Sequence, residues 1–285
     1  MALYQDSRQP KHSTSYLTKM QHTTPTPLIP HYSKNLIIII GGVRSGTTVF
    51  RHMLSTHPDV VDHGEIFLSS NKNGYFRILE RIIKKNPNLI FPENNEIVFR
   101  HYLKILTPEA GRAVIDIKYE HLCQLPTAWQ LPHKTPAILT YLNNLDAKII
   151  HLKRNPFNAV ISNLVAQKTK RYHVSAKTNQ PNNAPIKISI SRDLVIQEIK
   201  DRIQASDLVE NTLNNQGIIT IEYEELFDIN NYFKDEICSK TATFIGIEDS
   251  FERAPLLQKV INQSLENTIL NWHEICDLAP ENIRS

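Results

Sequence analysis

The residues best suited to chemistry lie in one short segment, GGVRSGTT, at positions 41–48. Three of the chain's eight glycines, Gly41, Gly42 and Gly46, fall within these positions. Glycines this close together let the backbone turn sharply and direct several N–H groups at one point, at the positive end of a following helix. The segment therefore predicts a binding site for a phosphate or a similar anion.

Polar side chains strengthen this prediction. Ser45, Thr47 and Thr48 supply hydroxyl donors, and Arg44 supplies a planar cation that can bind an oxyanion through two hydrogen bonds. The glycine spacing is that of a P-loop, but Thr47 occupies the position of the P-loop lysine. An ATPase or kinase would use that lysine, together with an acid at the end of a strand that holds magnesium. In VIDIK the strand continues past the acid to Lys118, which disfavours a metal-dependent NTPase.

A second candidate anion site follows the apolar run at 148–152, in the segment LKRNPFNAVIS. Arg154 comes at the end of this predicted strand, and Ser162 follows about two helical turns after the start of the next helix. Ligands of open α/β sheets bind outside the carboxyl ends of the strands, so we expect Arg154 on the same rim as the glycine segment. Two anion sites on one rim indicate a ligand with two separate phosphates.

A carboxylate and a lysine complete the candidate site. Glu65 follows a glycine in DVVDHGEIF, where it could act as a general base on an acceptor hydroxyl. Lys118, at the end of another predicted strand, could stabilise negative charge on a transferred group. We therefore assign catalytic candidates at Arg44, Glu65 and Lys118.

The elements that must position these residues alternate between strands and helices. Strands are predicted at 36–40, 113–117, 148–152 and 218–222, with long helical stretches between them. Asn155-Pro156 is a typical helix start and launches a helix to about Gln167, and another helix extends from Ser191 to near Gly217. The pattern predicts an α/β fold with a mostly parallel sheet and helices on both faces.

The amino-acid composition limits the classes of partner and of site that the chain can have. The 32 Lys+Arg and 29 Asp+Glu residues give a net charge of +3, too balanced for a nucleic-acid coat or a polybasic membrane anchor. The three cysteines lie far apart and predict neither disulfides nor a metal site, and no apolar run is long enough to span a membrane. We expect a cytoplasmic protein with a flexible arm at 1–34 and a single domain at 35–285.

Taken together, these segments resemble the sulfotransferases that use 3′-phosphoadenosine 5′-phosphosulfate (PAPS). GGVRSGTT is similar to their 5′-phosphosulfate loop, and LKRNPFNAVIS is similar to their 3′-phosphate segment, with Arg154 and Ser162 at matching positions. Closer similarity is to the bacterial carbohydrate and glycolipid branch, including nodulation-factor sulfotransferases. In that branch HGEIF matches a stretch whose glutamate is the proposed base, and DIKYEHL matches a segment with a lysine.

The resemblance extends to the C-terminal third of the chain. TIEYEELF resembles a family segment and adds Tyr223, and LLQKVINQSLENTILNWHEI resembles the cofactor-covering loop and closing helix and adds Lys259. The implied fold is the P-loop-like sulfotransferase fold, with PAPS as co-substrate and no metal. The implied acceptor is a small molecule or glycan, and the oligomeric state stays open.

Three alternatives remain at this point. GGVRSGTT and HPDVVDHGE also resemble tyrosylprotein sulfotransferases, which keeps a peptide acceptor open. A kinase or NTPase that has lost its lysine would have a similar glycine segment, and so would a noncatalytic nucleotide-binding module.

Overall fold

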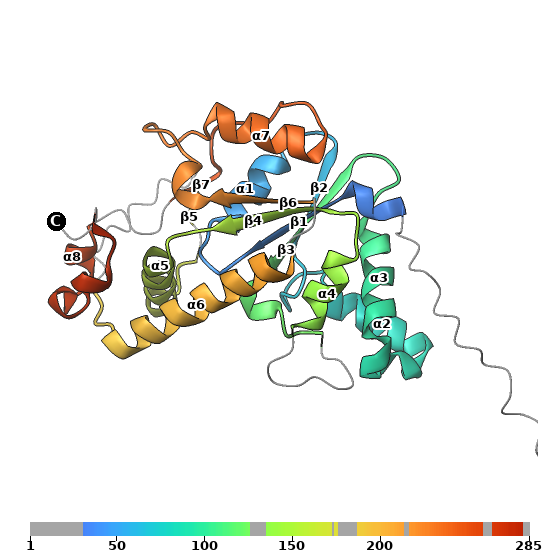
Figure 1. The fold of residues 1–285 in the computed structure, drawn as a ribbon, viewed down its shortest axis with the longest axis horizontal. Helices are drawn as coiled ribbons and strands as arrows, with labels where there is room; N and C mark the ends of the chain where they lie inside the picture. The colour runs from blue at the N-terminus through green and yellow to red at the C-terminus, as the bar shows by residue number, and fades with distance from the viewer. Residues whose placement is uncertain are drawn as a thin grey trace, which may run out of the picture.

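A five-stranded parallel sheet forms the centre of the computed structural model, which describes residues 31–125, 135–172, 174–175, 187–213, 217–258 and 264–281 (Figure 1). The strand order is β2-β3-β1-β4-β6, and every neighbouring pair is parallel. The sheet confirms the predicted α/β fold. The strands are β1 Leu36–Gly41, β2 Val60–Glu65, β3 Arg112–Lys118, β4 Lys148–Lys153 and β6 Ile218–Glu222.

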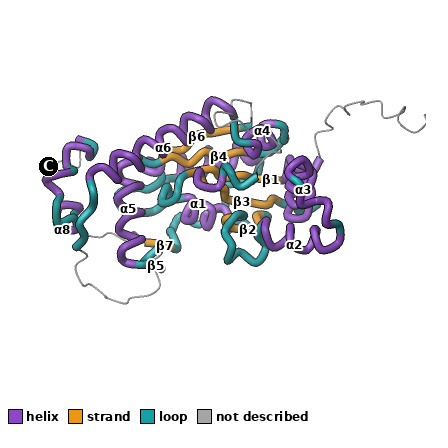
Figure 2. Tube along the Cα trace, turned by 90° about the horizontal axis from the view of Figure 1, so that it is seen from below, coloured by secondary structure: helices purple, strands orange, loops and turns teal. Residues whose placement is uncertain are grey.

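Helices cover both faces of this sheet (Figures 1 and 2). They are α1 Thr47–Leu54, α2 Tyr75–Lys85, α3 Asn95–Leu106, α4 Ala137–Asn143, α5 Pro156–Thr169, α6 Arg192–Thr212, α7 Asp235–Ile245 and α8 Leu265–Thr268. A short antiparallel pair joins β5 Val174–Ser175 to β7 Leu257–Gln258. Within the residues so described, no helix has both the length and the apolar character needed to cross a membrane.

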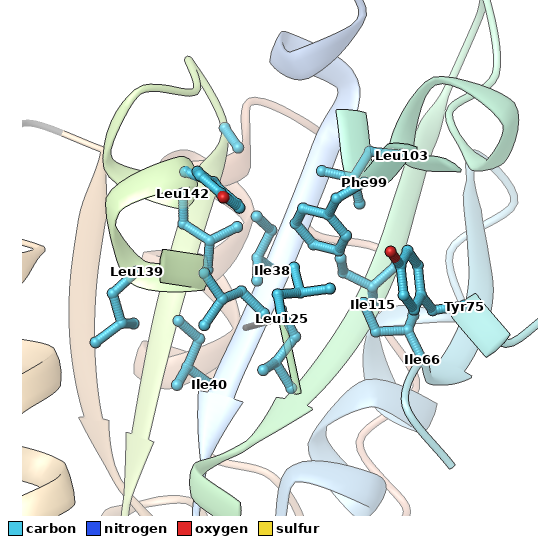
Figure 3. Close-up of a cluster of buried hydrophobic side chains, with 14 of the residues drawn as sticks. Ile38, Ile40, Ile66, Tyr75, Phe99, Leu103, Ile115, Leu125, Leu139 and Leu142 are labelled. Atoms are coloured by element: carbon cyan, nitrogen blue, oxygen red, sulfur yellow. The ribbon is translucent and has the colours of Figure 1, made fainter. Parts of the chain in front are cut away.

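The central strand β1 supplies apolar side chains to both layers. Successive side chains of a strand point to opposite faces, so Ile38 and Ile40 enter one cluster while Ile37 and Ile39 enter another. The first cluster packs against α3 and α4 (Figure 3), and the second packs against α1 and α7. An all-apolar strand buried on both faces explains why LIIII is readable as a central parallel strand.

Local sequence signals set the start of the helix that follows β4. The Asn155 side chain accepts a hydrogen bond from the Asn158 backbone N–H at 3.1 Å, and Pro156 occupies the first helical position. This start was predicted, and the helix ends at Thr169, two residues beyond the predicted end. The helix α6 begins after Ser191, as predicted, and ends at Thr212, before Gly217.

The C-terminal segment packs on α5 and α6. The Asn271 side chain donates to the Ile190 carbonyl at 2.8 Å and accepts from its N–H at 3.0 Å. Trp272 contacts the Phe157 ring edge-on, at the first turn of α5. These contacts place residues 264–281 beside the end of the sheet at which α5 begins (Figure 2).

Residues 31–34, which the sequence assigns to the arm, form the start of a 3₁₀ helix at His31–Asn35. Tyr32 donates to the Arg100 carbonyl at 3.0 Å, and Ser33 is fully buried. Residues 1–30 of the predicted arm lie outside the described part of the chain.

Candidate active site

The predicted site residues that the structure describes lie near the carboxyl ends of the five parallel strands, which share one end of the sheet (Figure 1). Glu65 is the last residue of β2, and Lys118 is the last residue of β3. Arg154 follows β4, and Tyr223 follows β6. The segment after Gly41, at the end of β1, lies between them in the strand order. The topology therefore brings together Arg44 and Tyr223, which are 179 positions apart in the sequence.

Two glycines are required by close contacts in or next to the loop before α1. Gly46 has φ of 86° and precedes the first residue of α1. A Cβ atom at Gly46 would lie 2.3 Å from a ring carbon of Tyr223, and one at Gly41, just before the loop, would lie 2.6 Å from the Leu152 carbonyl oxygen. Backbone and ring can approach this closely only because glycine has no side chain.

Arg44 and Arg154 link the two predicted anion sites directly. Arg154 Nη1 donates to the Arg44 carbonyl oxygen at 2.8 Å, and Arg44 Nε donates to Ser162 Oγ at 3.1 Å. Arg44 also donates to the Tyr172 carbonyl. The Arg154 guanidinium stacks 4.4 Å from the centre of the Tyr223 ring, a cation–π contact that fixes its orientation.

Burial disfavours the charged form of both arginines, and at Arg154 the nearby Tyr223 and Glu224 offset this only in part. Burial, followed by the nearby charge of Arg154, lowers the pKa of Arg44, and burial lowers the pKa of Arg154. Both remain protonated, because a guanidinium does not lose its proton in proteins. Arg154 Nε is also buried without a hydrogen-bond partner among the described residues. Two partly desolvated like charges and an unused donor form a site that an anion would stabilise.

Lys118 lies at the centre of a second group of contacts. Its Nζ is 2.8 Å from Asp116 Oδ2 and 3.5 Å from Glu65 Oε1, and it also donates to Thr47 Oγ1. Lys118 is 3% exposed, whereas the Glu65 side chain is 21% exposed. The Lys118 ammonium is therefore held by the buried side chains of Asp116 and Thr47, whereas the Glu65 carboxylate remains accessible to solvent.

Two further predicted site residues, Ser45 and Thr48, have no side-chain hydrogen bond with the Arg44–Arg154 pair or with Lys118 among the residues that the structure describes. Ser45 is buried, and its N–H donates to the Gly42 carbonyl at 3.1 Å. Thr48 is half-buried in the first turn of α1. Lys259 lies outside the described residues.

The sequence did not single out several charged groups that contact this edge. Arg202 donates from α6 to the Val43 carbonyl at 2.8 Å, and burial lowers the pKa of His121, which lies close enough to feel the charge of Glu65. Arg51 and Asp62 form a hydrogen bond of 2.6 Å behind Glu65. The Asp116–Lys118 pair could have been found, because residues i and i+2 share a face of a strand. Arg202 gave no signal, since it lies 159 residues from Val43.

No group of three or more His, Cys, Asp or Glu residues within the described ranges could hold a metal ion.

The fold and the site together define an α/β protein with an anion-binding rim at the carboxyl ends of its strands. A family model described as Sulfotransferase family matches residues 36–239, and the chain belongs to that family. The chain is thus a sulfotransferase. A search of curated proteins gives no match.

Three solved structures to which the chain is similar are described as sulfotransferases or a sulfotransferase domain. A sulfotransferase from Alicyclobacillus acidocaldarius is 14% identical with a TM-score of 0.44, over 85% of this chain and 90% of that one. The sulfotransferase domain from the curacin biosynthetic pathway is 17% identical with a TM-score of 0.44, over 80% and 78% of the two chains. A mouse sulfotransferase complexed with PAP is 14% identical with a TM-score of 0.40, over 75% and 60%.

Proposed function

We propose that this sulfotransferase transfers a sulfuryl group from PAPS to a hydroxyl of a carbohydrate or glycolipid, with Glu65 as general base. One observation carries the proposal. The Lys118 ammonium lies 3.5 Å from the Glu65 carboxylate and in contact with the loop residue Thr47, on the same rim as the Arg44–Arg154 pair. A cation and a base are thus adjacent at the place where the loop would hold an anion.

The described residues fit a ligand with two phosphate groups. The loop offers backbone N–H groups at the start of α1, which favour an anion. The buried Arg154 Nε has no hydrogen-bond partner among the described residues, and burial, followed by the charge of Arg154, lowers the pKa of Arg44. We assign the 5′ end of PAPS to Arg44, Ser45, Gly46, Thr47 and Thr48, its 3′-phosphate to Arg154 and Ser162, and further contacts to Tyr223 and Lys259.

PAPS supplies an activated sulfuryl group whose bond to the 5′-phosphate breaks as the bond to the acceptor oxygen forms. Glu65 would take the proton from the acceptor hydroxyl at its carboxylate, which requires a position within hydrogen-bond reach of that hydroxyl. Lys118 and Arg44 would stabilise negative charge on the sulfuryl oxygens and on the departing phosphate. In-line positioning and charge stabilisation then account for most of the rate, as in phosphoryl transfer.

The structure favours this function over that of a kinase. Asp116 is the acid of VIDIK that a P-loop kinase would need on magnesium, but its Oδ2 accepts a hydrogen bond from Lys118 at 2.8 Å. The side chain is also 0% exposed. It serves instead as the anchor of the candidate catalytic lysine.

A transfer screen tests the proposal. Labelled PAPS is incubated with the protein and with separate sets of sugars, glycolipids, phenols and tyrosine peptides, and transfer is measured for each set. We expect label on a sugar or glycolipid hydroxyl. Label on tyrosine peptides alone would replace the acceptor class, and no transfer to any set despite binding of PAPS would favour a noncatalytic binding module.

A further inference from the structure

Behind Glu65 and Lys118 lies a pair of buried ionic contacts that the proposed reaction does not use. Arg51, in α1, is 8% exposed, and its Nη1 donates to both carboxylate oxygens of Asp62 in β2, at 2.6 and 2.8 Å. Its Nε lies 3.9 Å from Asp116 Oδ2 in β3. One guanidinium therefore spans the two strands that end in the candidate base and the candidate lysine.

The contact with Asp62 leads to Glu65. Asp62 Oδ1 also accepts a hydrogen bond from the Gly64 N–H at 2.8 Å, and Gly64 has φ of 76°. The register of β2 against β3 shifts between Asp62 and Glu65. Such bulges turn a side chain away from the regular direction of a strand. The Arg51–Asp62 pair thus holds the turn that aims the Glu65 side chain.

The Asn71 side chain binds the same turn at two further points. Its Nδ2 donates to the His63 carbonyl at 2.8 Å and to the Glu65 carbonyl at 3.0 Å. The backbone around Glu65 is therefore held by Asp62 at Gly64 and by Asn71 at the carbonyls of His63 and Glu65, as a precisely aimed base requires.

The contact with Asp116 leads to Lys118. Asp116 Oδ2 lies between the Arg51 and Lys118 cations, at 3.9 and 2.8 Å. The other carboxylate oxygen, Oδ1, is buried without a hydrogen-bond partner among the described residues. The Asp116 carboxylate is thus held by these two cations, so the place of Arg51 affects the place of Lys118.

Burying these charges is unfavourable, since each ion loses hydration, and apolar residues could fill the same volume. We propose that Arg51 is a positioning residue that sets Glu65 and Lys118 relative to each other, through Asp62 and Asp116 respectively. This inference rests on the proposed function, because it assigns a purpose to the spacing of its two catalytic candidates. A lysine at position 51 could not replace the arginine, since a single ammonium lacks the planar fork that reaches both carboxylates.

The test compares Arg51→Lys and Asp62→Asn with the matched control Arg112→Lys. Arg112 lies at the opposite end of β3, where it donates to Asn35 Oδ1 at 2.9 Å and to the Ile245 carbonyl at 3.3 Å. For each full-length variant we would measure urea unfolding, the affinity for adenosine 3′,5′-bisphosphate (PAP) by calorimetry, and turnover of saturating labelled PAPS with the acceptor found by the screen, or with water.

We expect turnover by Arg51→Lys to fall by about 10²-fold, the scale of a misplacement of about 1 Å, while its PAP affinity stays within about threefold of wild type. Asp62→Asn should show the same split, and it replaces Arg51→Lys if that variant does not fold. The control should keep wild-type turnover. Wild-type turnover by both site variants, or an equal loss in the control, would overturn the inference.

Failure of the proposed function has a different signature. In that case the wild-type protein itself would neither bind PAP nor consume PAPS, and the inference about Arg51 would fall with it. Binding and turnover by the wild type, without a selective effect of the variants at positions 51 and 62, would overturn the inference alone.

Discussion

Glu65 and Lys118 end neighbouring strands, and their side chains lie 3.5 Å apart. They differ in exposure, because the Lys118 side chain is 4% exposed and that of Glu65 is 21% exposed. The more exposed Glu65 carboxylate can reach the hydroxyl of an acceptor. The buried Lys118 ammonium is fixed where it could stabilise negative charge on the transferred sulfuryl group. At the scale of residues, these positions support the roles proposed above.

Glu65→Gln tests the base. The amide keeps the size of the side chain but cannot take a proton, so we expect turnover of PAPS to fall by about 10²–10⁴-fold. PAP affinity measured by calorimetry should be unchanged, because the phosphate contacts lie on Arg44 and Arg154. Turnover close to that of the wild type would remove Glu65 as the base.

Arg154→Ala tests the second anion site. Losing a hydrogen bond to a charged group costs about 1.5–3 kcal/mol, so PAP affinity should fall by about 10- to 100-fold. Lys153→Ala is the matched control, since its ammonium is bound to Glu210 at 2.9 Å. An equal loss in both variants would show that only the local charge matters.

Most candidate residues at the rim could be found from the sequence, because they lie next to strand ends or inside a glycine-rich segment. Arg51 could not be, because helix α1 presents it to Asp62 and Asp116 only after three elements have packed. Arg202 is similar, since α6 must first lie across the loop to bring it to Val43. Long-range contacts of this kind have no local pattern.

At the scale of elements, the strand β2 shows where local patterns fail. Its sequence VVDHGE has a single buried residue, Val60, followed by exposed or half-buried positions. The strand β2 is an outermost strand of the sheet, and it contains a glycine, which weakens a strand pattern. Each of the four predicted strands has at least three apolar residues among its five predicted positions, whereas β2 has only Val60 and Val61.

The strand β4, next to the central strand β1, carries a buried histidine that should make stability depend on pH. His151 is fully buried, its Nε2 lies 2.6 Å from the Tyr119 hydroxyl, and its Nδ1 lies 3.6 Å from Glu210. Burial, only partly offset by the charge of Glu210, lowers the pKa of His151 from 6.5 to about 4. The unfolded chain therefore takes up a proton more readily than the folded one.

The sign of the effect follows from this difference. The contribution of His151 to the free energy of unfolding is fully present above pH 6.5. It is lost as the pH falls toward 4, by on the order of 3 kcal/mol. In His151→Gln the amide can still bond to Tyr119 but does not titrate, so the decrease should be smaller. Urea unfolding of both proteins between pH 4 and 7 checks this, and parallel curves would contradict it.

At the scale of the whole molecule, the parallel arrangement of the strands brings residues that are distant in sequence to one end of the sheet. Parallel strands end at one edge, so segments near positions 44, 65, 118, 154 and 223 meet although they lie far apart in sequence. The shared end of the parallel strands follows from strand–helix alternation, which the sequence carries, whereas the strand order and β2 come from the structure. The contacts within the edge depend on side-chain packing, which the sequence alone does not specify.

The most direct test of the central claim is calorimetric titration of the full chain with PAP and with ATP, each with and without magnesium. We predict that PAP binds tightly and equally well with and without the metal, because Arg44 and Arg154 supply the positive charge at the rim. ATP should bind more weakly, since it lacks the 3′-phosphate. Magnesium-dependent ATP binding that is tighter than PAP binding would contradict the account.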